Sequence, residues 1–96
     1  MAKIKGKILI IDDNQEMLSA LGMFLRQHFE LVQTEKNPEM TPTLMRESVF
    51  DVILLDMNFK AGISTGNEGI YWMREILKSD PDATVVFITA YGDVEL

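Results

Sequence analysis

The side chains of this sequence that could do chemistry are mainly acidic, and they follow apolar runs. Asp12 and Asp13 come directly after one apolar run, and Asp56 ends a second. A hydroxyl residue, Thr89, ends a third run. Grouped carboxylates repel one another and lose hydration, so a bound cation would stabilise them, and an all-oxygen ligand set favours Mg²⁺. A carboxylate beside that ion could attack a phosphoryl group whose charge the ion neutralises.

Each of these residues also has a purely structural interpretation. An aspartate such as Asp13 often caps a helix, and Asp56 could equally belong to a turn. A threonine at the end of a strand, such as Thr89, is commonly a good strand former and nothing more. The chemical interpretation therefore depends on whether these polar residues meet at one edge of a sheet.

Strands and helices alternate along the predicted chain. The strands 7–11 and 51–57 are expected to be buried on both faces, because their apolar runs are continuous. This order predicts a parallel sheet joined by right-handed crossovers, with a ligand site beyond the carboxyl ends of its strands. The expected strands cover 7–11, 31–35, 51–57 and 83–89, and the expected helices cover 14–29, 41–48 and 68–79.

Two of these helices carry more detailed expectations. In the segment 14–29, apolar residues spaced three and four apart predict one helical face. Asp13, with Glu16 three residues later, has the form of a capping box at the start of this helix. In the last helix, Tyr71 and Trp72 are neighbours and cannot share a helical face, so one of them should be exposed.

Composition limits the classes of function. A chain of 96 residues with 47% hydrophobic and 25% charged residues has the values of one ordinary globular domain. Its formal net charge of −6 disfavours direct contact with nucleic acid or with an anionic membrane. The sequence has no cysteine, which excludes disulfides and thiolate chemistry, and no apolar run approaches the ~18 residues that span a bilayer.

Three segments of the chain are distinctive when they are taken together and in order. They are IleLeuIleIleAspAspAsn (8–14), AspValIleLeuLeuAspMet (51–57) and ValValPheIleThrAlaTyr (85–91). With them the sequence resembles the receiver domain of two-component response regulators over essentially its whole length. The resemblance implies an α/β fold, a flavodoxin-like doubly wound parallel sheet, incomplete here with about four strands and three helices. It also implies a cytoplasmic phosphorelay switch that catalyses only its own phosphotransfer and dephosphorylation, rather than a metabolic enzyme.

The resemblance also implies roles for individual residues. Asp56 matches the phosphoacceptor, which takes a phosphoryl group from a phosphohistidine of a sensor histidine kinase. Asp13 matches the direct Mg²⁺ ligand, and Asp12 matches the ligand that acts mainly through water. Asn58 matches the residue that lends its backbone carbonyl to the metal.

The last part of the chain matches the family's switch region. Thr89 matches the hydroxyl that moves toward the phosphoryl group, and Ala90 matches the small residue that leaves room for it. Tyr91 matches a residue that faces the output surface. The tail 89–96 is similar to receivers of the nitrogen-regulation class, whose full proteins carry an ATPase and a DNA-binding domain. The implied output is therefore the regulation of transcription.

The chain departs from the family in two places. Family receivers continue past the position of Leu96, and their lysine that pairs with the phosphoryl group has no counterpart here, so we expect residues 1–96 to be a truncated receiver domain. The strand 83–89 would then be an uncovered apolar edge, which predicts self-association or the exchange of segments between copies. The loop after Asp56 lacks the usual proline-glycine turn, and Lys60 within it could swing toward the site.

Two other functions remain open from the sequence. A non-phosphorylated pseudo-receiver would serve only as a dimerisation or interaction module, and the missing lysine keeps this alternative open. An aspartate-nucleophile phosphatase would need a second aspartate two residues after Asp56, where this sequence has Asn58. The intact acidic residues favour the phosphoacceptor receiver over both alternatives.

Overall fold

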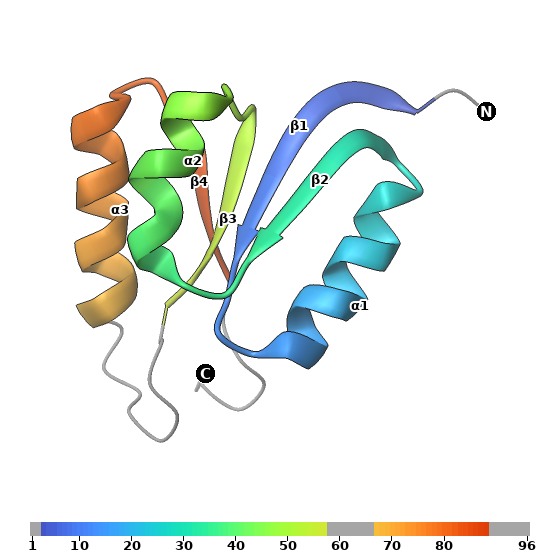
Figure 1. Ribbon diagram of the computed structural model, residues 1–96, viewed down its shortest axis with the longest axis horizontal. Helices are drawn as coiled ribbons and strands as arrows, with labels where there is room; N and C mark the ends of the chain where they lie inside the picture. The colour runs from blue at the N-terminus through green and yellow to red at the C-terminus, as the bar shows by residue number, and fades with distance from the viewer. Residues whose placement is uncertain (1–2, 58–66, 89–96) are drawn as a thin grey trace, which may run out of the picture.

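Four parallel strands form a single sheet, and helices lie on both of its faces (Figure 1). The computed structural model describes residues 3–57 and 67–88. The strand order is β2-β1-β3-β4, so the direction of winding reverses between β1 and β3. In chain order the elements are β1 (Ile4–Ile11), α1 (Gln15–Arg26), β2 (Phe29–Glu35), the short 3₁₀ helix η1 (Pro38–Met40), α2 (Thr41–Glu47), β3 (Val52–Asp56), α3 (Asn67–Ser79) and β4 (Val85–Ile88).

The register of the strands brings their carboxyl ends to one edge of the sheet. β1 pairs with β3 up to Ile11↔Leu55, and β3 pairs with β4 up to Asp56↔Ile88. Because all of these pairs are parallel, the three strands end together, at the lower edge of the sheet in Figure 1. The predicted parallel α/β sheet is therefore confirmed, and its strand order makes β1, β3 and β4 neighbours, which the chemical interpretation of the aspartates requires.

The core has two halves, one on each face of the sheet. Leu9 and Ile11 of β1 pack into the cluster on the face that α2 and α3 cover. The alternate residues, Ile8 and Ile10, pack into the cluster on the α1 face. All four side chains are buried, which explains why this strand is continuously apolar, as the sequence predicts for a strand covered on both sides.

The first helix ends earlier than its apolar spacing predicts. α1 runs only to Arg26, and Phe29 opens β2, where it is the partner of Ile4 in β1. The ring of Phe29 still packs against the cluster on the α1 face of the sheet. Phe29 thus joins the core from a strand, and the prediction that it belongs to the helix is wrong.

The first helix also begins differently from the prediction. Its N-cap is Asn14, whose side-chain oxygen accepts a hydrogen bond from the backbone N–H of Met17 at 3.1 Å. The backbone N–H of Asn14 donates in turn to the carboxylate of Asp12 at 2.9 Å. The predicted capping box of Asp13 and Glu16 is therefore wrong, because the residue after Asp13 takes the capping position.

The other two helices begin and pack as expected. α2 begins at Thr41, with Pro42 in its first turn. In α3 Tyr71 is 54% exposed, whereas Trp72 packs against the cluster on the α2 and α3 face. The prediction that one of these neighbours is exposed is confirmed, although their rings still make an edge-to-face contact with centroids 4.9 Å apart.

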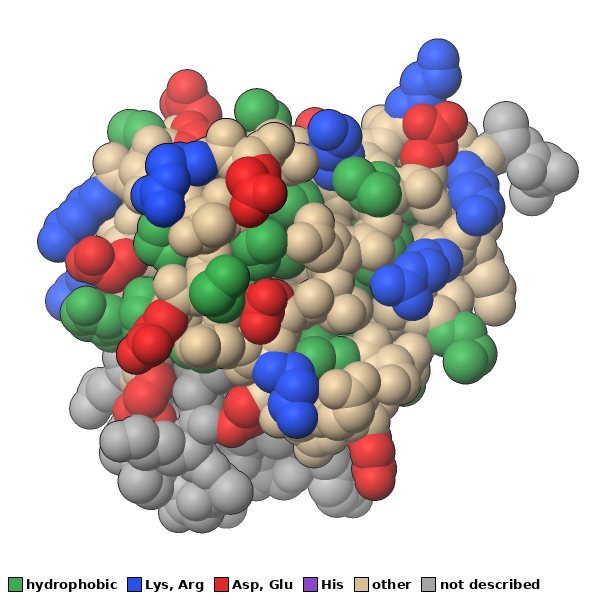
Figure 2. All heavy atoms as spheres, in the orientation of Figure 1, with side chains coloured by type: hydrophobic (Ala, Val, Ile, Leu, Met, Phe, Trp, Pro, Cys, Tyr) green, Lys and Arg blue, Asp and Glu red, His purple; other side chains and the backbone are tan. Residues whose placement is uncertain are grey.

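Acidic and basic side chains are interspersed on the face of the molecule that Figure 2 shows, and apolar side chains lie between them. Within residues 3–57 and 67–88, none of the helices is both long and apolar enough to cross a membrane.

Candidate functional site

Three aspartates meet at the carboxyl edge of the sheet. Asp12, Asp13 and Asp56 each offer one carboxylate oxygen, and these three oxygens all lie within 4.8 Å of one another. Asp12 and Asp56 are only 4% and 6% exposed, whereas Asp13 is open to solvent. We call these three residues the acidic cluster. The sequence predicts that these residues lie close together, and the structure confirms it, although Asp56 is far from the other two along the chain.

The end of β1 fixes the position of Asp12. Its backbone N–H donates to the carbonyl of Glu35 at 3.1 Å, so the pairing between β1 and β2 continues one residue beyond the strand. Its carboxylate accepts the backbone N–H of Asn14, which closes the turn into α1. Asp12 is therefore held by one hydrogen bond of its backbone and one of its side chain, and Asp13 lies between two fixed residues.

The end of β3 fixes the position of Asp56. Asp56 is the last residue of β3 and the partner of Ile88 in β4. The next backbone N–H, that of Met57, donates to the carbonyl of Ile88 at 3.2 Å. Because β3 is bordered by β1 and β4, the carboxyl group of Asp56 stands beside the two aspartates that follow β1.

Burial, and after it the charge of one neighbour, raises the pKa of one member of the acidic cluster. Partial burial raises the pKa of the Asp13 carboxyl group above its usual value, and the negative charge of Asp12 raises it further. The backbone N–H of Asp13 and the charge of Lys36 lower it in part without cancelling the rise. The ionised cluster is thus an unfavourable grouping of like charges, and a cation among the three carboxylates would relieve it. A donor set made only of carboxylate oxygens suits Mg²⁺.

Sequence reasoning gave no role to Gly69, and the structure places this residue against the end of β3. The backbone N–H of Gly69 donates to the carbonyl of Met57 at 2.9 Å. A Cβ atom built on Gly69 would lie 2.5 Å from the Cα atom of Met57. A glycine inside a helical pattern is the one signal in the sequence that points to such a close approach.

The remaining predicted site residues belong to two segments outside the part of the chain that the structure describes. Asn58, Thr89, Ala90 and Tyr91 lie outside the described residues, and so does Lys60. The nearest described neighbours of these segments are Met57, at the end of β3, and Ile88, the last residue of β4.

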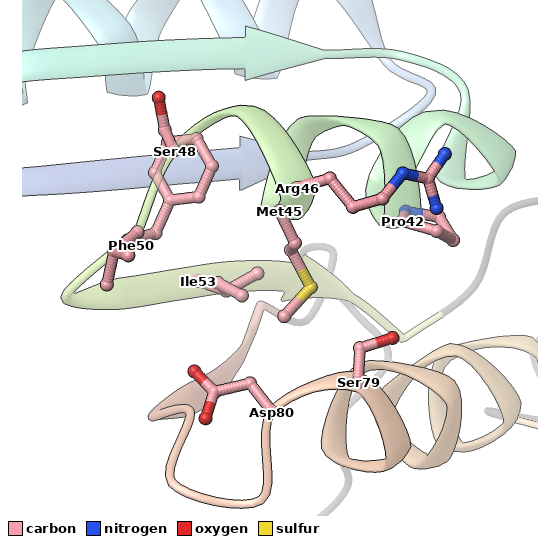
Figure 3. A pocket seen from close by; sticks show the side chains of 9 residues that line it. Pro42, Met45, Arg46, Ser48, Phe50, Ile53, Ser79 and Asp80 are labelled. Carbon is pink, nitrogen blue, oxygen red and sulfur yellow. The ribbon is translucent and has the colours of Figure 1, made fainter.

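A cavity of ≈ 330 Å³ lies at the opposite edge of the sheet, between α2, the start of β3 and the end of α3. Figure 3 shows Met45 reaching from α2 toward α3, with Ile53 of β3 beside it. Arg46 and Asp80 also line this cavity. The strand end that borders the cavity is the amino end of β3, and no residue of the acidic cluster lines the cavity.

Comparison with known proteins gives one family. A sequence model of the family described as the response regulator receiver domain matches residues 8–96. A response regulator receiver protein from Anaeromyxobacter sp. strain Fw109-5 is 32% identical over 85 residues, which cover 88% of this chain and 34% of that protein. The chain spans about a third or less of the length of the curated relatives that it matches.

Solved structures give the same result. The N-terminal signal receiver domain of a two-component response regulator from Bacteroides fragilis matches with a TM-score of 0.79 and 42% identity, over 94% of this chain and 70% of that chain. The response regulator TrrA from Thermotoga maritima, solved in complex with Mg²⁺ and BeF, matches with a TM-score of 0.74 and 27% identity, over 91% of this chain and 71% of that chain. The chain therefore belongs to the family of response regulator receiver domains.

Proposed function

We propose that this receiver domain accepts a phosphoryl group on Asp56 from a sensor histidine kinase, in a reaction that depends on Mg²⁺. The observation that carries the proposal is the proximity of three carboxylates. One carboxylate oxygen from each of Asp12, Asp13 and Asp56 lies within 4.8 Å of the other two. An isolated aspartate at a strand end would have no such neighbours. Receiver domains act as signalling switches, and this grouping supplies what the switching reaction needs.

The acidic cluster would hold the metal with its carboxylate oxygens, and Asn58 would add its backbone carbonyl by family resemblance. Bound Mg²⁺ would neutralise part of the negative charge on the phosphoryl oxygens. Asp13 is the most open member of the cluster, so it is suited to meet an ion that keeps several of its waters. Asp12 is held by its hydrogen bond from Asn14 and would act mainly through such a water.

The reaction itself is the transfer of one phosphoryl group between two side chains. A carboxylate oxygen of Asp56 attacks the phosphorus atom of a phosphohistidine on the kinase. An O–P bond forms while the N–P bond breaks, and the released imidazole nitrogen keeps the electron pair of the broken bond. The product is an acyl phosphate on Asp56, which water later hydrolyses to restore the carboxylate and free phosphate.

The switch that reads this change would lie after β4. Thr89 would turn its hydroxyl group toward the phosphoryl oxygens, Ala90 would leave room for them, and Tyr91 would carry the change to the output surface. These assignments rest on the family resemblance of the segment 85–91, and the family match extends through it to residue 96. A charge that appears at Asp56 would thus bias a two-state element.

We also propose the setting in which the domain acts. It would work in the cytoplasm as part of a regulator of transcription, of the nitrogen-regulation class, with no nucleic-acid or membrane contact of its own. The net charge of −6 supports the absence of direct phosphate-backbone contact. The rest of the regulator would supply the DNA-binding function.

We propose further that copies of the chain associate through β4. β4 is an outer strand of the described sheet, its residues Val85–Ile88 carry no charge, and Val86 is 46% exposed. The other outer strand, β2, is less open, because the guanidinium of Arg26 donates to the backbone carbonyl of Val32 at 3.2 Å. An apolar edge without charges is the one that a second strand would join.

The test of the proposed function is a covalent label on Asp56. Incubation with a small phosphodonor and Mg²⁺ should give a label that is labile in acid and is released by hydroxylamine, as an acyl phosphate is. Asp56→Asn should abolish it, while Asp51→Asn, a change at an exposed aspartate near the amino end of β3, should leave it intact. A label that persists in Asp56→Asn, or a wild-type chain that takes none, would refute the proposal.

A further inference from the structure

The first turn of α3 lies against the end of β3 more closely than any side chain would allow. Gly69 is buried, and a Cβ atom built on it would lie 2.5 Å from the Cα and 2.8 Å from the carbonyl oxygen of Met57. The same atom would lie 2.9 Å from the carbonyl oxygen of Asp56. All three neighbours are backbone atoms, so they cannot turn aside as the end of a flexible side chain would.

A second buried helical glycine shows that this requirement is specific to Gly69. A Cβ atom built on Gly22 in α1 would find its nearest neighbours at 3.1 Å, in the guanidinium of Arg26, and at 3.4 Å, in the methyl group of Thr34. Both neighbours belong to side chains, and the long Arg26 side chain can shift. Gly22 is therefore a matched control for replacing a buried helical glycine by alanine.

The contact at Gly69 bears directly on the acidic cluster. Met57 is tied on both sides, because its N–H donates to Ile88 in β4 and its carbonyl accepts from Gly69 in α3. Asp56 is the residue before Met57, and its own carbonyl is one of the atoms that a Cβ at Gly69 would meet. A displacement of this backbone would therefore carry the Asp56 carboxylate with it.

We propose that Gly69 is a positioning residue for the acidic cluster. Because it has no side chain, α3 can approach β3 closely enough for the Asp56 carboxylate to come within common reach of those of Asp12 and Asp13. The inference rests on the proposed function, since it is Mg²⁺ binding at the cluster that would depend on this approach.

Mg²⁺ binding at the acidic cluster tolerates only a small displacement of the backbone at the end of β3. Ordinary contact begins at 3.4 Å, so the contact that now stands at 2.5 Å must open by about 0.9 Å to admit a methyl group. Mg²⁺ demands near-ideal octahedral geometry with metal–oxygen distances of about 2.0–2.1 Å. The contact with the carbonyl oxygen of Asp56, now at 2.9 Å, must open by about 0.5 Å, which is still large compared with the deviation that the ion accepts.

The experiment compares Gly69→Ala with Gly22→Ala in the whole chain. Mg²⁺ binding is measured by isothermal titration with MgCl₂, and Trp72 fluorescence gives a second readout from α3. Gly69→Ala should weaken Mg²⁺ binding about 10–100-fold, the usual loss when the support of a metal ligand is disturbed. Gly22→Ala should bind Mg²⁺ as the wild type does.

Stability is measured in parallel, so that a loss of fold is not mistaken for a loss of position. Chemical unfolding without metal identifies conditions in which both variants are fully folded, and binding is compared there. If Gly69→Ala does not fold, it is combined with Met57→Gly, whose freer backbone can move away from the new methyl group. The folded double variant should still bind Mg²⁺ about 10-fold or more weakly, because the end of β3 has moved.

The outcomes separate this inference from the proposed function. If the wild type binds Mg²⁺ and takes the label on Asp56, but folded Gly69→Ala or the folded double variant binds Mg²⁺ equally well, only the role of Gly69 is overturned. If the wild type itself neither binds Mg²⁺ nor takes the label, both fail. A weakening confined to the Gly69 variants, with Gly22→Ala unchanged, supports the positioning role.

Discussion

The backbone N–H of Asn14 donates to the carboxylate of Asp12 across 2.9 Å, at the point where β1 leads into α1. Asn14 in turn caps α1 through the N–H of Met17. Asp12 therefore has a structural task at the start of a helix in addition to its proposed part in holding Mg²⁺. The two tasks can be separated, because the hydrogen bond needs only an oxygen atom, whereas the metal needs the negative charge.

The first prediction follows from this separation. Asp12→Asn keeps an oxygen that can accept the Asn14 N–H and removes the charge that repels Asp13, so without metal its free energy of unfolding should equal or slightly exceed that of the wild type. Its Mg²⁺ affinity should fall about 10-fold or more, because the charge is gone. Asp12→Ala should lose the hydrogen bond as well, which costs about 1 kcal/mol and lowers the melting temperature by about 4–8 °C.

Thermal unfolding without metal and isothermal titration with MgCl₂ measure the two effects. Equal melting temperatures for Asp12→Asn and Asp12→Ala would show that the bond to Asn14 does not stabilise the turn. An unchanged Mg²⁺ affinity in Asp12→Asn would show that Asp12 takes no part in holding the ion.

The proximity of the three residues of the acidic cluster could be predicted from the sequence for a simple reason. Continuous apolar runs identify strands buried on both faces, and such strands belong to parallel sheets. In a parallel sheet every strand ends at the same edge, so the aspartates that end two neighbouring strands must lie close together. Strand order therefore places Asp12, Asp13 and Asp56 at the same edge of the sheet, and the close contact at Gly69 concerns only their exact separation.

The details that were wrong or missed depend on contacts between residues that the sequence does not place. Asp13 and Asn14 are both good N-caps, and the bond from Asn14 to Asp12 goes with the choice of Asn14. Phe29 fits the helical spacing equally well, but it is paired with Ile4 across the sheet. A glycine inside a helical pattern indicates a close neighbour for Gly69, but the sequence does not identify that neighbour as the end of β3.

The second prediction concerns the charge of Asp13. In the absence of Mg²⁺, Asp13→Asn should raise the melting temperature, because burial and the charge of Asp12 disfavour the ionised Asp13 carboxyl group in the folded state. Asp13 is exposed, so the gain should stay below about 1 kcal/mol, which corresponds to less than about 4–8 °C. The variant should lose the stabilisation that Mg²⁺ gives to the wild type, about 2.7 kcal/mol when the free ion is at 100 times its dissociation constant.

Thermal unfolding in EDTA and in MgCl₂ measures both effects. Glu30→Gln, which removes an exposed charge of β2 outside the acidic cluster, is the control for net charge. It should keep the full response to Mg²⁺. If Asp13→Asn gains as much stability from Mg²⁺ as the wild type does, Asp13 is not part of the metal site.

The third prediction is a pH dependence. The raised pKa of Asp13 means that the folded chain holds this proton more tightly than the unfolded chain does. The cost of ionising Asp13 is therefore fully present above its folded pKa, and it is relieved as the pH falls through that pKa toward the unfolded value. Mg²⁺ must displace the same proton from the folded chain, so its affinity should fall as the pH drops below the folded pKa, by up to about tenfold per pH unit.

Titration with MgCl₂ at a series of pH values from neutral downward gives the Mg²⁺ affinity directly. The same series on Asp13→Asn should lack the share of the dependence that belongs to Asp13, while the other carboxylates still titrate. Parallel curves for the wild type and the variant would mean that the Asp13 proton does not compete with the ion.

The fourth prediction concerns association through β4. A charged side chain on an outer strand opposes pairing with another strand, so Val86→Lys should prevent association of the chain. Leu31→Lys, an equivalent change at a 41% exposed residue of β2, should leave it intact, because β2 is not the strand that pairs. Val86→Lys should raise the dissociation constant of the dimer at least about tenfold, which corresponds to about 1.4 kcal/mol.

The β4 strands of two chains would pair in a defined direction. Antiparallel pairing of β4 with its copy places Val85 of one chain near Ile88 of the other, and it puts the two acidic clusters at opposite ends of the joined strands. Parallel pairing would bring both clusters to the same edge, where their charges repel.

Sedimentation equilibrium over a range of protein concentrations measures the association of the chain. The association should strengthen little with added salt, because the pairing strands carry no charge. A wild-type chain that stays monomeric throughout, or an equal loss of association in Leu31→Lys, would rule out pairing through β4.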